Sequence, residues 1–111
     1  MTYDVALAER VRDLVRGLPG VTEKRMFGGC AFLVDGHLAV SASGRGGLLV
    51  RVAPAMTDEL VARPGVDPFV MRGRALDGWL AVSSEAVAED AALHAWVERG
   101  VTYARSLTPG A

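Results

Sequence analysis

The segment Arg25-Met26-Phe27-Gly28-Gly29 (RMFGG) places an arginine, a thioether and an aromatic ring directly before two glycines. In a regular strand successive side chains point to opposite faces, so only one of Met26 and Phe27 can join the main core. Paired glycines in a strand mark a bulge or the close approach of another backbone. The segment therefore predicts a bent strand. The alternative is a pocket in which Arg25 and Phe27 flank a floor of glycine backbone.

Short apolar runs bounded by turn residues predict further strands on both sides of this segment. Asp35-Gly36 supplies the residues of a two-residue hairpin turn, in which both positions take positive φ. Gly73 and Asp77-Gly78 are expected to separate the last two strands. The expected strands cover residues 21–27, 30–34, 37–43, 48–52, 69–72 and 79–82.

Apolar residues recur at three- and four-residue steps near both ends of the chain, a pattern typical of amphipathic helices. We expect helices at about residues 3–17, 56–63 and 88–107, with Thr2 capping the first. Gly100 would let another backbone approach the last helix closely. Two amphipathic helices can cover the apolar face of an antiparallel sheet. The predicted fold class is α+β, a two-layer sandwich with five to six antiparallel strands, N- and C-terminal helices and a short middle helix.

The composition is that of one globular domain spanning residues 1–111. The net charge of −1 lacks the positive excess of a nucleic-acid-binding protein, so we expect no direct nucleic-acid binding. No apolar run approaches the roughly 20 residues of a membrane span, and the first residues lack the pattern of a signal peptide. We expect a cytoplasmic protein that does not contact membranes.

Eleven of the twelve basic residues are arginines, and three of them suggest a binding site. Arg51 lies in an apolar strand, where a guanidinium needs a carboxylate, an anion or water. If their strands align, Arg25, Arg51 and Arg72 can converge on one anionic group. The alternative is separate surface arginines that pair with nearby carboxylates. The predicted anion- or partner-binding residues are Arg25, Phe27, Arg51 and Arg72.

Cys30 is the only cysteine, which excludes an intrachain disulfide and a thiolate metal cluster. His37 could meet Cys30 across a hairpin. However, nothing nearby in the sequence lowers the thiol pKa, and buried free cysteine is commonly inert. His37, His94 and Cys30 lack the spacing of metal ligands. We therefore expect no catalytic residues, no metal and no cofactor.

Five segments follow one another in a familiar order: RMFGG at 25–29, FLVDG at 32–36, LLVRV at 48–52, DPFVMRGR at 67–74 and EDAALHAWV at 89–97. Together they resemble the N-terminal domain of the TfoX/Sxy family over essentially the whole chain, to about Leu107. The most specific element is Met26, Phe27, Gly28 and Gly29 followed by Asp35 and Gly36. The resemblance implies a helix-flanked antiparallel sheet and brings no catalytic residues with it.

Two-domain members of that family regulate bacterial competence genes by assisting a cyclic-AMP-responsive activator at promoters. The chain ends after one domain, so we expect a single-domain bacterial member. The leading hypothesis is a non-catalytic regulatory domain that binds a protein, such as transcription machinery, through a sheet edge or an apolar patch. Homodimerisation is a further option. The alternative hypothesis is a small-molecule anion-binding domain, or an unrecognised enzyme, that uses the arginine cluster.

Overall fold

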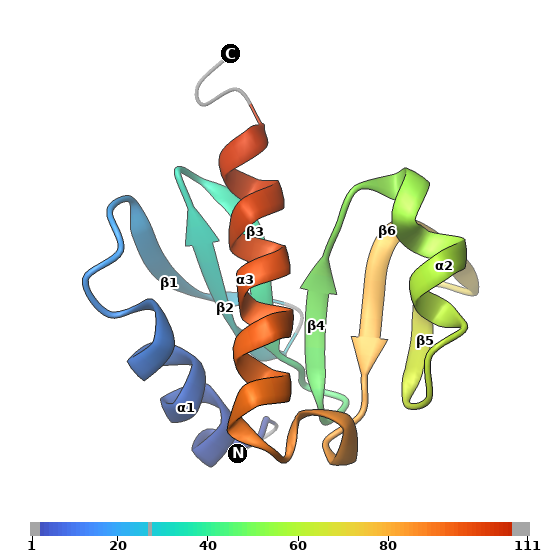
Figure 1. Cartoon of the computed structure of the whole chain (residues 1–111), viewed down its shortest axis with the longest axis horizontal. Helices are drawn as coiled ribbons and strands as arrows, with labels where there is room; N and C mark the ends of the chain where they lie inside the picture. Colours follow the sequence, from blue (N-terminus) through green and yellow to red (C-terminus); the bar gives the residue numbers. More distant parts are fainter. Residues whose placement is uncertain (1–2, 27, 108–111) are drawn as a thin grey trace.

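One antiparallel sheet of six strands, in the order β1-β2-β3-β4-β6-β5, forms the centre of the molecule (Figure 1). The computed structural model describes residues 3–26 and 28–107. The α+β class and the antiparallel sheet expected from the sequence are confirmed. The elements in chain order are α1 (Val5–Val15), β1 (Val21–Met26), β2 (Gly29–Val34), β3 (His37–Ala42), β4 (Leu48–Arg51), a 3₁₀ turn η1 (Pro54–Met56), α2 (Thr57–Val61), β5 (Val66–Met71), β6 (Arg74–Val82), a second 3₁₀ turn η2 (Glu85–Val87) and α3 (Asp90–Ser106).

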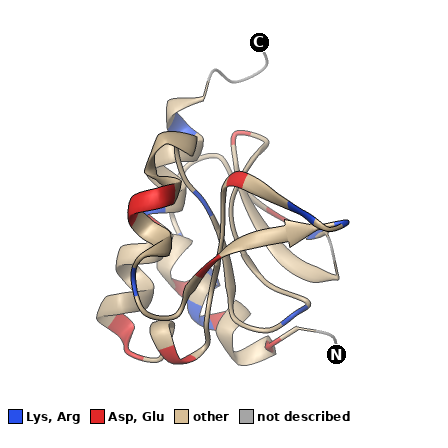
Figure 2. Cartoon of the chain, turned by 90° about the vertical axis from the view of Figure 1, so that its right-hand side faces the viewer, with Lys and Arg blue, Asp and Glu red and all other residues tan. Residues whose placement is uncertain are grey.

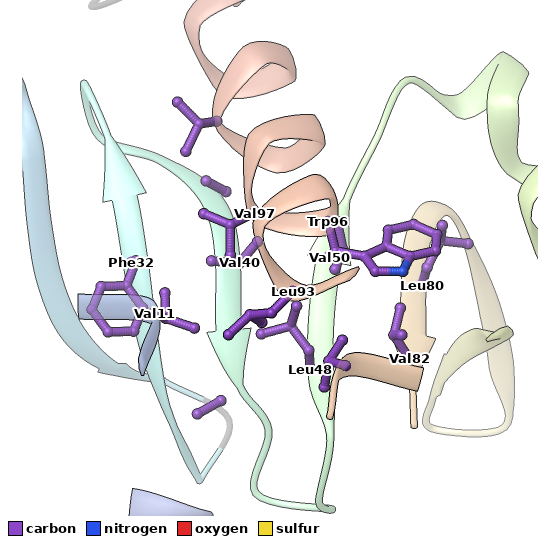
Figure 3. Close-up of a cluster of buried hydrophobic side chains, with 14 of the residues drawn as sticks. Val11, Phe32, Val40, Leu48, Val50, Leu80, Val82, Leu93, Trp96 and Val97 are labelled. Atoms are coloured by element: carbon purple, nitrogen blue, oxygen red, sulfur yellow. The ribbon is translucent and has the colours of Figure 1, made fainter. Parts of the chain in front are cut away.

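The helices cover one face of the sheet, with α1 and α3 side by side in front of it in Figure 1. In Figure 3 the side chains of α3, including Leu93 and Trp96, point toward Val50 on β4 and Leu80 on β6. All four residues belong to one buried cluster. Burial of these apolar side chains, together with those of α1, supplies the main stabilisation of the fold.

Gly100 marks the closest contact between α3 and the sheet. A Cβ atom at this position would lie 2.4 Å from the carbonyl oxygen of Ala39 and 2.8 Å from a methyl group of Val40. Only a glycine lets the helix lie this close to β3. The close approach expected from the sequence is confirmed.

At the start of α1, the side chain of Asp4 caps the helix by accepting a hydrogen bond from the backbone N–H of Leu7 at 3.1 Å. The predicted cap, Thr2, lies outside the described residues. The carboxylate of Asp4 also lies at the positive end of the helix dipole, so it stabilises the helix in two ways.

The hairpin turn at Asp35-Gly36 has the predicted conformation, with φ of 52° and 84°. In RMFGG, β1 ends at Met26, which pairs with Gly29, and β2 starts at Gly29, one residue before the predicted start. A Cβ on Gly29 would lie 2.3 Å from the carbonyl oxygen of Ala42. Gly29 therefore serves a close backbone approach, one of the two roles expected of the paired glycines. The bulge lies further along, between Phe32 and Leu33 in the pairing of β2 with β3.

The β5–β6 hairpin is longer than predicted. Strand β5 starts at Val66 instead of residue 69, and β6 starts at Arg74 instead of residue 79. The turn is Arg72-Gly73, with φ of 54° and 75°. Asp77-Gly78 was predicted to help separate the strands, but it lies within β6. Because β5 is an edge strand, it can include Pro68, which has no N–H to donate.

A second apolar cluster lies apart from the main core. Its residues come from all six strands and alternate with main-core residues such as Phe32 and Val50, so the cluster lies on the opposite face of the sheet. The buried members are Ala31, Leu38, Leu49 and Phe69, and the partly buried ones are Met26, Leu33, Met71, Leu76 and Trp79. Figure 2 shows the sheet at the side of the helix layer, with the strands curling away from it. Met26 thus joins this smaller cluster instead of the main core.

Candidate interaction site

An apolar groove of about 280 Å³ runs between α1 and α3. Its walls include Leu14 on α1, Leu18 just after α1, and Val97 and Val101 on α3. Leu18 is 39% exposed, which makes it one of the few large hydrophobic side chains that remain exposed on the described surface. The groove therefore offers apolar area to solvent next to a tightly packed core.

Polar contacts join the α1 and α3 regions beside this groove. Arg10 Nη2 donates to Asp90 Oδ1 and to the Ala88 carbonyl oxygen, each at 3.1 Å. Arg10 and Asp90 line a neighbouring pocket that shares Leu14 with the groove. Arg105, which lines the groove, donates from Nη2 to the Pro19 carbonyl oxygen at 3.3 Å. These exposed contacts add little to the packing of the two helices.

The rim of the groove is polar. His94 and Glu98 are exposed on α3 beside the apolar walls, and Arg105 lies at one end. Glu98 forms no ion pair among the described residues. Figure 2 shows acidic and basic segments interspersed over both layers of the molecule. An apolar centre with a mixed polar rim is the usual anatomy of a protein-binding surface.

The β1 edge of the sheet is poorly suited to bind another strand. Its four central residues, Thr22 to Arg25, are all exposed and three of them are charged. Charged side chains on an edge strand oppose pairing with a further strand. Strand addition is therefore disfavoured at β1.

The β5 edge is blocked in another way. Pro68 has no N–H to donate, and the pairing of β5 shifts register between Pro68 and Val70. Arg45, from the loop between β3 and β4, donates a hydrogen bond from Nη1 to the carbonyl oxygen of Val70 and lies 4.7 Å from the Phe69 ring centroid. The helix layer is thus better suited than either edge to receive a partner.

The three arginines singled out in the sequence lie in different settings. Arg25 on β1 lies over the Tyr3 ring, with Cζ 5.4 Å from the centroid. Arg51 on β4 lies over Trp79 and Tyr103, at 5.2 and 5.6 Å. Arg72 is exposed in the turn of the β5–β6 hairpin.

Among the described residues, no hydrogen bond or ion pair joins any two of these arginines to a common group. Phe27, the fourth predicted site residue, lies outside the described residues. A shared anion site formed by these residues stays a prediction. The sequence did not predict that Arg51 would contact aromatic rings. Trp79 lies directly opposite Arg51 in the β4–β6 pairing.

A polar cluster surrounds Cys30. Arg12 on α1 donates to both carboxylate oxygens of Glu23 on β1, from Nε and Nη2, each at 2.8 Å. These hydrogen bonds lower the pKa of Glu23 and raise that of Arg12. The thiol of Cys30 contacts Glu23 Oε1 at 3.6 Å. Burial, reinforced by the negative charge of Glu23, raises the pKa of Cys30 above 9.0.

This cluster is unsuited to nucleophilic catalysis, because the thiolate is the reactive form and a raised pKa suppresses it. The histidine considered as its partner lies elsewhere in the hairpin. Cys30 is opposite Ala42, whereas His37 is opposite Val34 at the far end of the same strand pair. The Arg12–Glu23 pair instead fastens α1 to β1.

Residues 3–26 and 28–107 contain no group of three or more His, Cys, Asp or Glu side chains arranged to hold a metal ion. Within the same residues, every helix is too short or too polar to cross a membrane.

The sequence analysis missed the groove as a site, because Leu14, Leu18, Val97 and Val101 were all assigned to the apolar stripes of core-facing helices. One feature of the sequence could have indicated the groove, namely Gly17 directly before Leu18. In the structure Gly17 follows the end of α1 with φ of 85°, so Leu18 does not continue the apolar stripe of the helix. An apolar residue beyond the helix end is free to line a surface groove.

Comparison with known proteins identifies the family of this chain. No curated protein and no solved structure matches the chain significantly. The family model described as the TfoX N-terminal domain matches residues 13–104, which include the last turn of α1, the whole sheet and most of α3. Because this match covers most of the 111 residues, the chain belongs to the TfoX N-terminal domain family.

Proposed function

We propose that this domain is a non-catalytic regulatory module that binds a partner protein through the groove between α1 and α3. Membership of the TfoX N-terminal domain family supports the general assignment. The observation that carries the proposal is the exposed apolar groove between α1 and α3, whose polar rim includes Glu98 and Arg105. The disfavoured sheet edges leave the helix layer as the surface for a partner.

The chemistry of the groove favours an amphipathic helix as its occupant. Two helices with apolar walls between them accept the apolar side chains of a third helix laid along them. The exposed carboxylate of Glu98 would face a basic group of that helix, and Arg105 an acidic one. The pairing of charges would fix the orientation of the bound helix more than its affinity.

Two exposed hydrophobic residues provide a matched test. Leu18 lines the groove and is 39% exposed, while Val70 lies on β5 and is 42% exposed. Wild-type domain, Leu18→Asp and Val70→Asp are immobilised at equal density and exposed to a lysate of the source cells. The proposal predicts that proteins retained by the wild type are also retained by Val70→Asp and are lost from Leu18→Asp.

Thermal unfolding of each variant checks that the fold is retained. Equal retention by all three proteins, or loss only with Val70→Asp, would contradict the proposal. Light scattering of the free domain distinguishes a second copy from another protein as the occupant. A dimeric mass that Leu18→Asp reduces to a monomer would assign the groove to self-association and overturn the proposal of a different partner.

A further inference from the structure

A second cleft, of about 380 Å³, lies between α3 and the chain segment from β4 to α2. Figure 1 shows α1 on one side of α3 and α2 on the other, so this cleft and the groove described above flank the same helix. The apolar side of the cleft includes Val52, Met56 and Leu60. A volume of this size, and an apolar lining with a few polar groups, are typical of small-molecule sites.

A buried hydrogen-bond network fixes the apolar side of this cleft. Thr57, at the start of α2, is only 8% exposed. Its Oγ1 accepts a hydrogen bond from the backbone N–H of Gly78 on β6 and donates one to the Pro54 carbonyl oxygen, both at 2.8 Å. The N–H of Val52 donates to the Gly78 carbonyl oxygen at 2.7 Å. Because the turn that carries Met56 is fastened to the sheet, the apolar surface is formed before a ligand binds, which lowers the cost of binding.

The polar side of the cleft, on α3, carries both signs of charge. Glu98 and Arg99 line it together with three residues that bear hydroxyl groups, Thr102, Tyr103 and Ser106. Glu98 and Arg99 are consecutive, and side chains one position apart on a helix do not face each other. Among the described residues, neither of them forms an ion pair. The cleft therefore offers a carboxylate and a guanidinium to a ligand, beside an apolar surface.

An aromatic contact restrains the guanidinium of this wall. Arg99 is half-buried, and its Cζ atom lies 5.3 Å from the ring centroid of Trp96. Trp96 is only 6% exposed and extends from α3 toward β4 and β6 (Figure 3). A guanidinium held over a ring keeps the N–H groups at its edge for forked hydrogen bonds. Arg99 is thus positioned by its neighbour without losing its capacity to bind a carboxylate.

From this arrangement we infer that the cleft between α2 and α3 binds a small zwitterion with an apolar body, such as an amino acid with an apolar side chain. The body lies on the surface formed by Val52, Met56 and Leu60. The carboxylate of the ligand accepts hydrogen bonds from Arg99, and its ammonium group donates to Glu98. Glu98 repels a simple anion and Arg99 repels a simple cation, so the two residues together select a ligand that carries both charges.

Four probes separate the parts of this recognition. L-Phenylalanine carries the apolar body and both charges, 3-phenylpropionate lacks the ammonium group, 2-phenylethylamine lacks the carboxylate, and glycine lacks the body. In a titration followed by amide NMR spectra, L-phenylalanine is expected to bind at least about tenfold more tightly than each of the others, because charge-assisted hydrogen bonds add to the apolar contact. Equal affinity for L-phenylalanine and any of the other three would overturn the inference, as would the absence of L-phenylalanine binding.

Variants locate the site and assign each charge. Glu98→Gln should weaken L-phenylalanine binding about tenfold without weakening that of 3-phenylpropionate, and Arg99→Gln should weaken it as much without weakening that of 2-phenylethylamine. Glu85→Gln and Arg74→Gln, at exposed positions that do not line the cleft, are the matched controls and should bind as the wild type does. Near-ultraviolet circular dichroism checks that the packing of Trp96 is retained. Wild-type affinity in either cleft variant, or an equal loss in either control, would contradict a zwitterion site at this cleft.

The protein-binding groove is tested separately from this cleft. Leu18 lines the groove and not the cleft, whereas Arg99 lines the cleft and not the groove. Leu18→Asp should therefore bind L-phenylalanine with wild-type affinity, and Arg99→Gln should retain the proteins that the wild-type domain captures. Loss of L-phenylalanine binding in Leu18→Asp would contradict the placement of the ligand in the cleft.

Discussion

The guanidinium group of Arg51 lies over the ring of Trp79, its cross-strand neighbour, with Cζ 5.2 Å from the ring centroid. The same group lies 5.6 Å from the Tyr103 ring, so it links the sheet to the last turns of α3. Cation–π contacts of this kind contribute roughly 0.5–1 kcal/mol each at partly exposed sites. An arginine in an apolar strand is thus accommodated by aromatic rings.

Replacing this arginine should destabilise the fold without disrupting it. Arg51→Gln is expected to lower the free energy of unfolding by about 1 kcal/mol, because both ring contacts lose their cation. The urea midpoint measures the effect, and Arg74→Gln serves as the control because its side chain is exposed. Equal midpoints for Arg51→Gln and wild type would show that the ring contacts contribute nothing.

Gly100 allows a test in which two effects have opposite signs. In an exposed helix, glycine to alanine stabilises by up to about 1 kcal/mol. Here the added Cβ would meet the Ala39 carbonyl oxygen at 2.4 Å, so Gly100→Ala should instead destabilise by about 1–3 kcal/mol. Thermal or urea unfolding decides the sign.

The matched control for Gly100 is Ala95→Gly, an exposed position in the same helix. Its loss of stability measures the helix-propensity effect alone. A more stable Gly100→Ala protein would contradict the close packing of α3 on β3.

The Arg12–Glu23 pair predicts a specific dependence of stability on pH. The hydrogen bonds from Arg12 lower the pKa of Glu23 below 4.5, so the native state favours the carboxylate. Its contribution is present above pH 4.5 and is lost as the pH falls through the lowered pKa. The difference in Tm between wild type and Glu23→Gln should therefore shrink as the pH falls below 4.5.

Both side chains of this pair are 40% exposed, so the difference in Tm at pH 7 should be small and should decrease with salt. A Tm difference that does not change as the pH falls through the acidic range below 4.5 would contradict the ion pair.

Cys30 should react slowly in the folded protein. Its thiol is buried and its pKa is raised, so little thiolate is present at pH 8. Reaction with a disulfide reagent such as DTNB should be much slower in buffer than in denaturant, because unfolding exposes the thiol and removes the raised pKa. Folding stability should also fall as the pH rises above 9.0, since the unfolded chain loses this proton first. Equal reaction rates in the two conditions would contradict the buried thiol.

Features that depend on neighbouring residues were predicted well from the sequence. Asp35-Gly36 forms the expected hairpin turn because the requirement for positive φ is local. Gly100 allows the expected close approach of another backbone. This was predictable because the glycine lies beside the apolar stripe of the last helix. The start of β5 was predicted three residues late, since Pro68 is tolerated only on an edge and the strand order was not known.

Features that join distant parts of the chain could not be predicted. The groove needs Leu18, just after α1, to lie beside Val101 on α3. No periodicity in the sequence encodes such meetings, because they arise when separate elements pack on one sheet. The ring partners of Arg51 were missed for the same reason.

Photo-crosslinking at two positions tests directly whether the groove between α1 and α3 receives a partner protein. p-Benzoylphenylalanine is placed at Leu18, inside the groove, or at Val70, on the opposite layer and similarly exposed. After irradiation in a lysate of the source cells, position 18 should give a discrete protein adduct that excess unlabelled domain suppresses, and position 70 should give none. Adducts of equal yield from both positions, or from position 70 alone, or from neither, would contradict a partner-binding groove in the helix layer.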